Sequence, residues 1–164
     1  MLPLLGNGAK GSTISVEDAD RRVLQILQRD GRISNQDLAA AAGLSNSACW
    51  RRVRALEAAG VIRGYAARLD AGQLGLGFHA MVHVHLTRHA GDTVDGFVTA
   101  IRARAEVLDC FATTGEADYH LRVMCADLDA YNRFLDVLFQ LPGVASARTN
   151  LVLREIKQDG ALPI

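Results

Sequence analysis

Three arginines that lie close together in the chain define its most distinctive chemistry. Arg51, Arg52 and Arg54 lie between Ser45 and Leu56, and no acidic residue interrupts this stretch. Guanidinium groups pair with guanine edges and with phosphate, and nearby hydroxyl and amide groups can add hydrogen bonds to bases. The stretch therefore predicts a surface that contacts a polyanion. The candidate contact residues are Ser45, Asn46, Ser47, Trp50, Arg51, Arg52, Arg54 and Arg63.

The same stretch has the spacing of a helix with two faces. At about 100° per residue, Cys49, Val53 and Leu56 fall on one side. The hydroxyl and guanidinium groups fall on the opposite side, and Arg52 lies at the flank between the two. Such a helix suits the major groove of DNA, although a cationic face that meets only water is the alternative interpretation. We expect Trp50 to pack against the following segment rather than to stack on DNA.

The residues before this helix predict a second helix that supports it. Ser34 can cap a helix, and Asp37 stands three residues later in the capping-box position. Residues 39–42 are alanines, which allow another helix to approach closely. Gly43 can take the left-handed backbone that ends a helix, and Ser45 can cap the next one. This arrangement is that of a helix-turn-helix.

Two flanking segments complete the expected domain. A helix capped by Ser15 is expected over residues 15–30, as the third member of the helix-turn-helix. Residues 61–69 contain two short β-prone runs around Gly64, which predict a hairpin wing. Arg63 and Arg68 would lie on this wing and contact phosphate, and such contacts fix register without reading sequence.

The second half of the chain repeats a strand–helix pattern. Residues 80–86 alternate apolar and polar side chains, as a half-buried strand does. One face of the resulting sheet would stay open, with Met81, His83 and His85 on it, so we expect a partner to cover that face. The fold class is therefore α+β, a winged helix-turn-helix followed by a ferredoxin-like βαββαβ domain. The other expected strands are 107–113, 119–125 and 144–156, and the helices begin at Asp92 and Asp127.

The expected organisation divides the 164 residues into two domains and two connecting segments. These are a flexible tail (1–14), a winged helix-turn-helix (15–69), a linker (70–78) and an effector-sensing and oligomerisation domain (79–164). The net charge is zero, but residues 1–70 carry ten Lys/Arg against seven Asp/Glu, and the remainder carry eight against eleven. This asymmetry suggests that only the first half meets an anion.

Several other classes of protein are disfavoured. The three cysteines show no C-x-x-C spacing, and we expect them to be buried thiols in a reducing compartment. No apolar run reaches the ~18 residues of a membrane span. His83, His85 and His89 could suggest a metal site, but a third or fourth ligand is missing, so interface or solvent-facing histidines are expected instead. No catalytic constellation appears, and no cofactor is expected.

Two longer patterns carry a family resemblance. Residues 20–39 and 43–65 resemble the winged helix-turn-helix of the Lrp/AsnC family, the leucine-responsive regulatory proteins. Residues 113–123 (TTGEADYHLRV), 141–144 (LPGV) and 154–158 (REIKQ) resemble that family's amino-acid-sensing domain. The similarity covers residues 15–164, and the occurrence of both halves in this order is specific.

The resemblance implies a transcription regulator in the cytoplasm of a bacterial or archaeal cell, associated with the nucleoid. Its partners would be double-stranded DNA and an amino acid, leucine or another apolar one. Homodimers built on the open sheet faces would assemble into larger homo-oligomers such as octamers.

The resemblance also implies that the effector binds between dimers, near the β–β turn. Gly115 would let backbone N–H groups approach a carboxylate, and Asp118 would pair with an ammonium; an ordinary hairpin turn is the alternative. The positions implied in effector binding, response or assembly are Thr113, Thr114, Gly115, Glu116, Asp118, Leu128, Val152 and Leu153.

The sequence departs from the family pattern at the start of the arginine-bearing helix. Asn46 and Ala48 stand where the family often has prolines, and Arg51 stands where an acidic residue is common. These departures leave docking on DNA intact but prevent the operator sequence from being inferred by analogy.

Two alternatives remain from the sequence. One is an architectural protein that wraps DNA with little sequence preference and no ligand. The other is an enzyme on the open sheet face, which would need a convergent polar cluster beyond Met81, His83 and His85.

Overall fold

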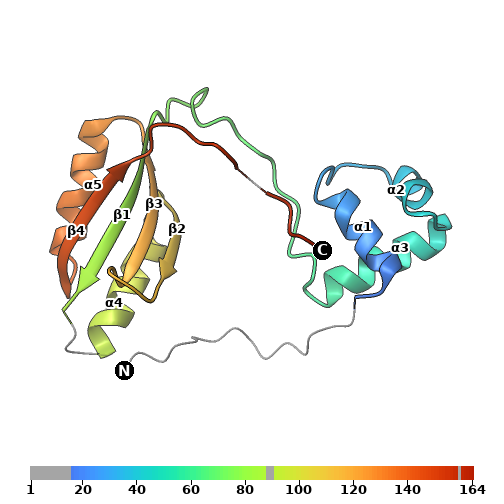
Figure 1. The fold of residues 1–164 in the computed structure, drawn as a ribbon, viewed down its shortest axis with the longest axis horizontal. Coiled ribbons are helices and arrows are strands. Elements are labelled where there is room, and N and C mark those ends of the chain that lie inside the picture. Colours follow the sequence, from blue (N-terminus) through green and yellow to red (C-terminus); the bar gives the residue numbers. More distant parts are fainter. Residues whose placement is uncertain (1–15, 88–90, 159) are drawn as a thin grey trace. The chain divides into compact units, whose positions relative to one another are not determined.

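The structure is a computed structural model that describes residues 16–87, 91–158 and 160–164 (Figure 1). It divides into two compact units. The first is Met1–Ala67 together with Lys157–Ile164, and the second is Arg68–Ile156. The end of the chain therefore belongs with the first unit, whereas we expected it in the second domain. The tail expected over residues 1–14 lies outside the described residues.

Three helices form the first unit: α1 (Asp18–Leu27), α2 (Asn35–Ala42) and α3 (Asn46–Ala58). The expected caps of α2 and α3 are confirmed, because Ser34 accepts the N–H of Asp37 and Ser45 accepts the N–H of Ala48. Gly43 ends α2 in the left-handed conformation, with φ 68°. The expected cap of α1, Ser15, lies outside the described residues.

The three helices share one hydrophobic core. Ala39 and Ala42 are each 1% exposed, so the small side chains of α2 do allow close helix packing. Cys49 is fully buried and Leu56 nearly so, which confirms the inward face expected for α3. The other buried members of this core are Val23, Leu24 and Leu38.

The segment that follows α3 differs from the expected wing. Residues 61–70 contain no strand, so the hairpin prediction was wrong. A two-stranded hairpin is marginal in water unless it packs on further structure. The segment is instead anchored at Tyr65, whose hydroxyl donates to Glu57 at 3.1 Å. The Tyr65 ring also lies close to Gly31: a Cβ added to Gly31 would be 3.3 Å from Cδ1 of Tyr65.

The second unit has the expected βαββαβ order. Its antiparallel sheet runs β2-β3-β1-β4. The last strand ends five residues earlier than expected: its ladder with β1 stops at the pair Ala80–Leu151, after which Val152 N–H still donates to His79 O. The elements are β1 (Phe78–Leu86), α4 (Gly91–Arg102), β2 (Val107–Ala112), β3 (Tyr119–Cys125), α5 (Leu128–Gln140) and β4 (Val144–Leu151).

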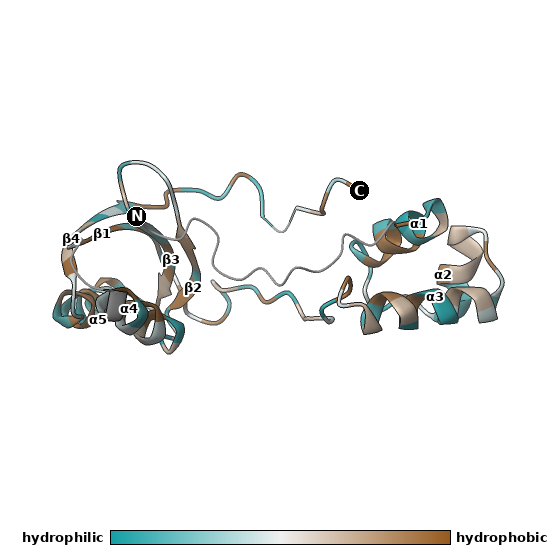
Figure 2. Ribbon diagram, turned by 90° about the horizontal axis from the view of Figure 1, so that it is seen from below, coloured by the Kyte–Doolittle hydropathy of each residue, from teal (hydrophilic) through white to brown (hydrophobic). Residues whose placement is uncertain are grey.

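Both helices of this unit cover the same face of the sheet (Figure 2). Val82 and Val84 of β1 and Leu121 of β3 are fully buried against Phe97 of α4 and Phe134 of α5. The alternate residues of each strand point to the other face, which no helix of the described unit covers. This second face is called the open face below.

Three further observations concern the chain as a whole. The Gln28 side chain accepts from Leu162 N–H at 2.6 Å and donates to Leu162 O, which ties the end of the chain to α1. Cys49 and Cys125 are buried as expected, but Cys110 is exposed. Among the described residues, no helix is both long and apolar enough to cross a membrane.

Candidate DNA-contacting helix and ligand site

The outward face of α3 carries two of the expected arginines. Arg51 and Arg54 are exposed because the inward positions of the helix are taken by Cys49 and Leu56. Arg51 has no acidic partner among the residues that the structure describes. Trp50 is 56% exposed, and its ring lies 5.7 Å from the guanidinium carbon of Arg54.

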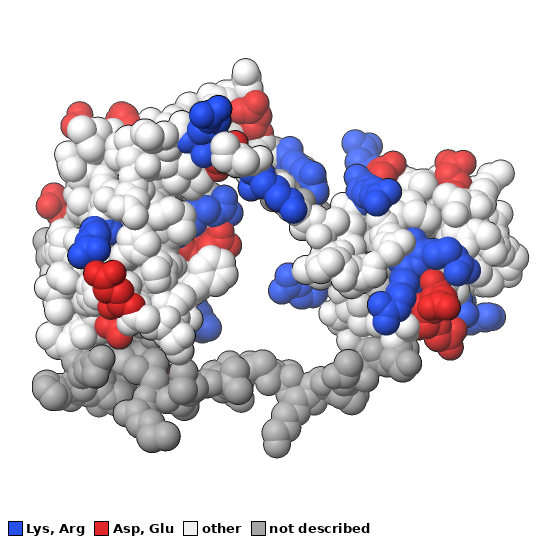
Figure 3. Space-filling model, viewed as in Figure 1, with Lys and Arg blue, Asp and Glu red and all other residues white. Residues whose placement is uncertain are grey.

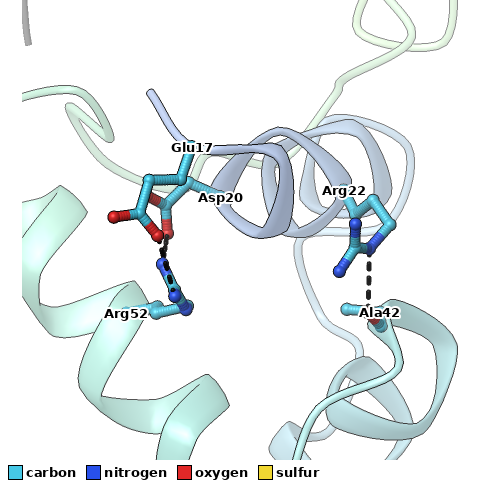
Figure 4. Close-up of polar contacts among 5 residues, drawn as sticks. All are labelled: Glu17, Asp20, Arg22, Ala42 and Arg52. Carbon is cyan, nitrogen blue, oxygen red and sulfur yellow. Dashed lines mark hydrogen bonds and ion pairs between the residues drawn. The ribbon is translucent and has the colours of Figure 1, made fainter. Parts of the chain in front are cut away.

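Arg52 is placed differently from the expectation that it contacts DNA. Its guanidinium lies 2.8 Å from Asp20 and 3.0 Å from Glu17 (Figure 4). Hydrogen bonds to Asp20 and then to Glu17 raise the pKa of the Arg52 guanidinium. These contacts fasten α3 to α1, so the geometry gives Arg52 a structural role instead.

A second contact in Figure 4 supports the end of α2. The Arg22 Nε of α1 donates to the carbonyl oxygen of Ala42 at 3.0 Å. The last carbonyls of a helix lack intrahelical partners, and this bond satisfies one of them. Arg22 and Arg52 together hold α1 against the two helices of the helix-turn-helix.

Arg54 is partly neutralised by its own helix. It lies 3.2 Å from Glu57, and its side chain is 65% exposed. Glu57 also accepts the hydroxyl of Tyr65, so one carboxylate holds both the arginine and the following segment. An exposed ion pair of this kind contributes at most about 1 kcal/mol, so Arg54 can leave it to contact phosphate or a base.

The remaining candidates for DNA contact lie at the two ends of α3. Ser45, Asn46 and Ser47 are exposed at its N-terminus, where the Ser45 hydroxyl is occupied as the cap. Arg63 is exposed in the segment after α3 and has no acidic partner among the described residues. In Figure 3, cationic and acidic side chains lie next to one another on the visible face of the unit. The positive charge of α3 is therefore local.

In the second unit, the turn between β2 and β3 is closed by its own hydrogen bonds. Thr113 donates its N–H to Asp118 O and its hydroxyl to Ala117 O, both at 3.0 Å. Gly115 has φ 142°, a conformation that favours glycine. The Asp118 carboxylate accepts the N–H of Leu86 at 2.8 Å, which joins the turn to the end of β1. Asp118 is therefore part of the fold, and Thr114 and Glu116 are exposed beside it.

The other three expected effector residues are not beside this turn. Val152 donates its N–H to His79 O, at the end of β1 opposite to Leu86. Leu128 begins α5, which follows the far end of β3. With ~3.3 Å per strand residue, the two groups lie on the order of 20 Å apart. Within one subunit the structure therefore does not bring the eight residues into one site. Leu153 is 92% exposed.

The open face carries a pair of histidines in direct contact. The Nδ1 atoms of His83 and His120 are 2.7 Å apart, and the rings are nearly perpendicular. Asn150 Nδ2 lies 3.1 Å from His83 Nε2. Burial, followed by the nearby positive charges of His120 and Arg148, lowers the pKa of His83. Burial and these charges therefore disfavour the protonated form of His83.

A cavity of about 240 Å³ opens beside this pair at the β2–β3 turn. Of the residues that line this cavity, the sequence indicated only Glu116 as an effector contact; Arg148, Asn150 and His120 were not indicated. Alternation along β4 would have put Arg148 and Asn150 on one face, but the strand register that sets them opposite His83 and Met81 is not readable from the sequence. The lining residues are His83, His85, Glu116, Ala117, His120, Arg148 and Asn150.

No group of three or more metal-ligating side chains occurs in the part of the chain that the structure describes. His89, which the sequence placed near His83 and His85, lies outside the described residues. The open face is more polar than the sequence indicated.

The fold and these two sites can be compared with known proteins. A family model described as winged helix-turn-helix DNA-binding matches residues 17–63. A second model, described as the Lrp/AsnC ligand binding domain, matches residues 79–162. The leucine-responsive regulatory protein of Serratia marcescens is 38% identical over 159 residues, which cover 96% of this chain and 97% of that protein.

Two solved structures are also similar. A transcriptional regulator of Neisseria meningitidis in complex with L-methionine has a TM-score of 0.87 and 40% identity, covering 91% of this chain and 97% of that one. A feast or famine regulatory protein of M. tuberculosis complexed with L-methionine has a TM-score of 0.79 and 31% identity, covering 88% and 97%.

A helix-turn-helix with an exposed cationic helix, joined to a four-stranded α+β ligand-binding domain, defines a DNA-binding transcriptional regulator. The matches extend over both domains and nearly the full length of the relatives. The chain belongs to the Lrp/AsnC family. These relatives are regulators rather than enzymes, and the enzyme alternative from the sequence gains no support from them.

Proposed function

We propose that this regulator binds specific DNA sequences through α3 and that an α-amino acid bound by its second domain controls this binding. One observation carries the DNA half of the proposal. Arg51 and Arg54 project from the exposed side of a helix whose other side is buried in the helix-turn-helix core. A recognition helix in the major groove presents its side chains in this way, and Arg is the residue that most often pairs with guanine.

Self-association would supply the second recognition helix. The open face of the sheet has no covering helix in the described unit, and we propose that a second copy covers it. A dimer would offer two α3 helices to half-sites about 34 Å apart, one turn of DNA. Further assembly into larger homo-oligomers, octamers among them, would add contacts along wrapped DNA and raise the overall affinity.

The ligand half of the proposal is supported by the match to the family's ligand-binding domain. Two similar solved structures are complexes with L-methionine, which makes an α-amino acid the first class of effector to test. Control requires that the ligand bind two states of the protein with different affinity. We propose that these states differ in assembly, and that the protein acts on the nucleoid in the cytoplasm.

The experiment begins with selection of DNA from a random-sequence pool by the full-length protein. Binding of the selected DNA and of random DNA is then measured by fluorescence anisotropy at one fixed salt concentration. A sequence-specific regulator should prefer the selected DNA by ~10³ or more. Equal affinity for both would contradict the proposal and favour an architectural protein that wraps DNA without a ligand.

The effector is sought by thermal shift with the twenty amino acids. A ligand that binds only the folded protein raises its melting temperature by mass action. The amino acid that does so should also change the anisotropy titration with selected DNA. An amino acid that shifts melting without changing DNA binding would contradict control by that ligand.

A further inference from the structure

Trp50 is the single tryptophan of the chain, and it lies on the outward face of α3. The indole is 56% exposed, although the same helix has buried positions at Cys49 and Leu56. It therefore contributes little to the helix-turn-helix core. Tryptophan and arginine are the residue types enriched where interfaces bind most strongly. An exposed indole among the arginines of a recognition helix therefore indicates a contact surface.

The ring of Trp50 supports the guanidinium of Arg54, one helical turn further along α3. The guanidinium carbon lies over the ring, 5.7 Å from its centroid, which is within the range of a cation–π contact. This contact uses the flat face of the guanidinium, whereas its N–H groups point outward in the plane of the group. Guanine accepts two such N–H groups through O6 and N7. Arg54 can therefore pair with guanine while it remains on the ring of Trp50.

The ion pair between Arg54 and Glu57 is different in this respect. It occupies Nη1 of Arg54, at 3.2 Å, and so it uses the rim of the guanidinium, where a base would bind. The Arg54 side chain is 65% exposed, and exposed ion pairs are weak because water and salt screen them. On DNA, the guanidinium would exchange Glu57 for a base and keep its contact with the indole.

The apolar ring also restricts the base that Trp50 itself can contact. In the major groove, adenine, guanine and cytosine present hydrogen-bond donors and acceptors, whereas thymine also presents its C5 methyl group. An indole face over a donor or acceptor would cover a polar group without pairing it, but against a methyl group it removes apolar surface from water. Trp50 and Arg54 are four residues apart, about 6 Å along the helix, and successive bases are ~3.4 Å apart.

We propose that Trp50 is a specificity-determining residue of α3, whose ring contacts the C5 methyl group of a thymine within about two base pairs of the guanine paired with Arg54. The same ring positions the Arg54 guanidinium for that guanine. This inference rests on the proposed function and names the bases that the helix reads. It gives Trp50 a role on DNA, whereas the sequence favoured packing within the protein.

The test removes the methyl group alone and uses the full-length parent protein. Each thymine of the selected DNA is replaced in turn by uracil, and binding is measured by fluorescence anisotropy at one fixed salt concentration. We expect one replacement in each half-site to weaken binding about fourfold, the ratio that corresponds to burial of one methyl-sized group. The fluorescence emission of Trp50 should shift to shorter wavelength on the selected DNA, and should shift less on this uracil-containing DNA.

Variants of Trp50 connect the effect to the ring. Trp50→Ala should weaken binding of the selected DNA about tenfold, because the methyl contact and the support of Arg54 are both lost. The same uracil replacement should then have no further effect. Trp50→Phe is the matched control, because it keeps an apolar ring and should retain the response to uracil. Trp50→Ala should also have a smaller effect when Arg54→Ala is already present, since the two residues are in contact.

The other outcomes overturn the inference in distinguishable ways. If no uracil replacement changes the affinity, the methyl contact is wrong while sequence-specific binding stands. If Trp50→Ala weakens selected and random DNA equally, the ring packs on the sugar–phosphate backbone instead. If Trp50→Ala also lowers the melting temperature, the response of the parent protein to uracil decides, because it does not depend on the folding of a variant. If the parent protein does not prefer the selected DNA, the proposed function fails as well.

Discussion

Neighbouring arginines on α3 have different surroundings. Arg51 and Arg54 project from the exposed side, whereas Arg52 is paired with Asp20 of α1 and with Glu17 just before it. We expect Arg51→Ala and Arg54→Ala each to weaken binding of selected DNA by ~1–3 kcal/mol, the usual effect of removing an arginine that pairs with a base. We expect Arg52→Ala to lower the melting temperature instead. Anisotropy titrations and thermal melts of the same preparations separate the two effects.

An exposed arginine outside α3 provides the control for these variants. Arg21→Ala on α1 removes the same charge, and it should change neither the melting temperature nor the preference for selected DNA. If Arg52→Ala reduced DNA affinity and left the melt unchanged, Arg52 would belong to the contact surface, and the role given to it by its ion pairs would be incorrect.

Glu57 neutralises part of the charge of Arg54. It is the one carboxylate that pairs with Arg54 among the described residues, and it would repel phosphate. Glu57→Gln removes the charge but keeps an oxygen acceptor for the Tyr65 hydroxyl. We expect DNA affinity to rise by ~0.2–1 kcal/mol, the usual worth of an exposed ion pair. Anisotropy at low and high salt checks this, because salt screening should remove the difference.

A decrease in affinity for Glu57→Gln would indicate that the carboxylate is needed to position Arg54 or Tyr65. The melting temperature distinguishes this outcome, because loss of the Tyr65 anchor would lower it as well.

We expect His83 to make the stability of the second unit depend on pH. Burial lowers its pKa, and so do the positive charges of His120, Arg148 and His85, while Glu116 acts in the opposite direction. In the unfolded chain the imidazole has a pKa of about 6.5. Below that value the unfolded chain binds more protons than the folded one. As the pH decreases, the free energy of unfolding therefore decreases, until the pH lies below the lowered pKa of His83 in the folded protein.

We therefore expect stability to be full above pH ~6.5 and to decline in mildly acid solution. His83→Gln, which cannot titrate, should flatten this part of the profile. Urea denaturation between pH 5 and 8, on the order of the range in which histidine titrates, measures the effect. Identical profiles for both proteins would show that His83 does not control the acid response.

At the level of the elements, the sequence predicted the parts of the fold that depend on local chemistry. Ser34, Ser45 and Gly43 mark helix ends through bonds within a few residues of each, and the structure has these bonds. The apolar positions at helical and strand spacing also led to the correct βαββαβ order. These signals are local, so one sequence is enough to read them.

Features that depend on distant partners could not be predicted in this way. β4 ends at Leu151, five residues before the expected end, and residues 61–70 form no strand; both outcomes depend on which distant backbone each segment meets. The attachment of Leu162 to Gln28 joins residues far apart in the chain. The residues that line the open-face cavity could not be predicted for the same reason, since Arg148 and Glu116 meet only through the register of the sheet.

Two glycines in helical regions should respond to the same substitution with opposite sign. Gly43 has a left-handed backbone at the end of α2, where an L side chain costs ~1–2 kcal/mol. Gly96 lies exposed in the body of α4, and a Cβ added there would meet nothing within 4 Å. Its replacement by alanine should stabilise the protein by ~0.5–1 kcal/mol. Urea denaturation of Gly43→Ala and Gly96→Ala measures both changes.

Gly96→Ala is the matched control, because it adds the same methyl group. If both variants gained stability, the helix-turn-helix would not require a left-handed residue between α2 and α3. The exit of the chain from α2 would then need another explanation.

The whole molecule carries no net charge, yet its DNA-binding half carries the excess of cations. Each subunit therefore offers few arginines to DNA, and Arg52 is removed from that number by its ion pairs. Under the self-association proposed for the open face, several subunits would contribute arginines to one DNA-binding event and so raise the affinity. The salt dependence of binding reports the number of phosphates contacted by the complete assembly.

Log Kd of the full-length protein should rise steeply with log salt, with a slope of ~0.9 per phosphate contacted. Arg63 and Arg51 should affect this slope differently. Arg63 lies beyond α3, where a phosphate contact is expected. Arg63→Ala should therefore weaken the binding of selected and of random DNA equally, and it should reduce the slope by ~1 for each phosphate that is no longer bound. Arg51→Ala should reduce mainly the preference for selected DNA, because base contacts specify while phosphate contacts position. Anisotropy titrations over a series of salt concentrations measure both quantities. A dependence that is flat for the parent protein would contradict docking through the arginines of α3.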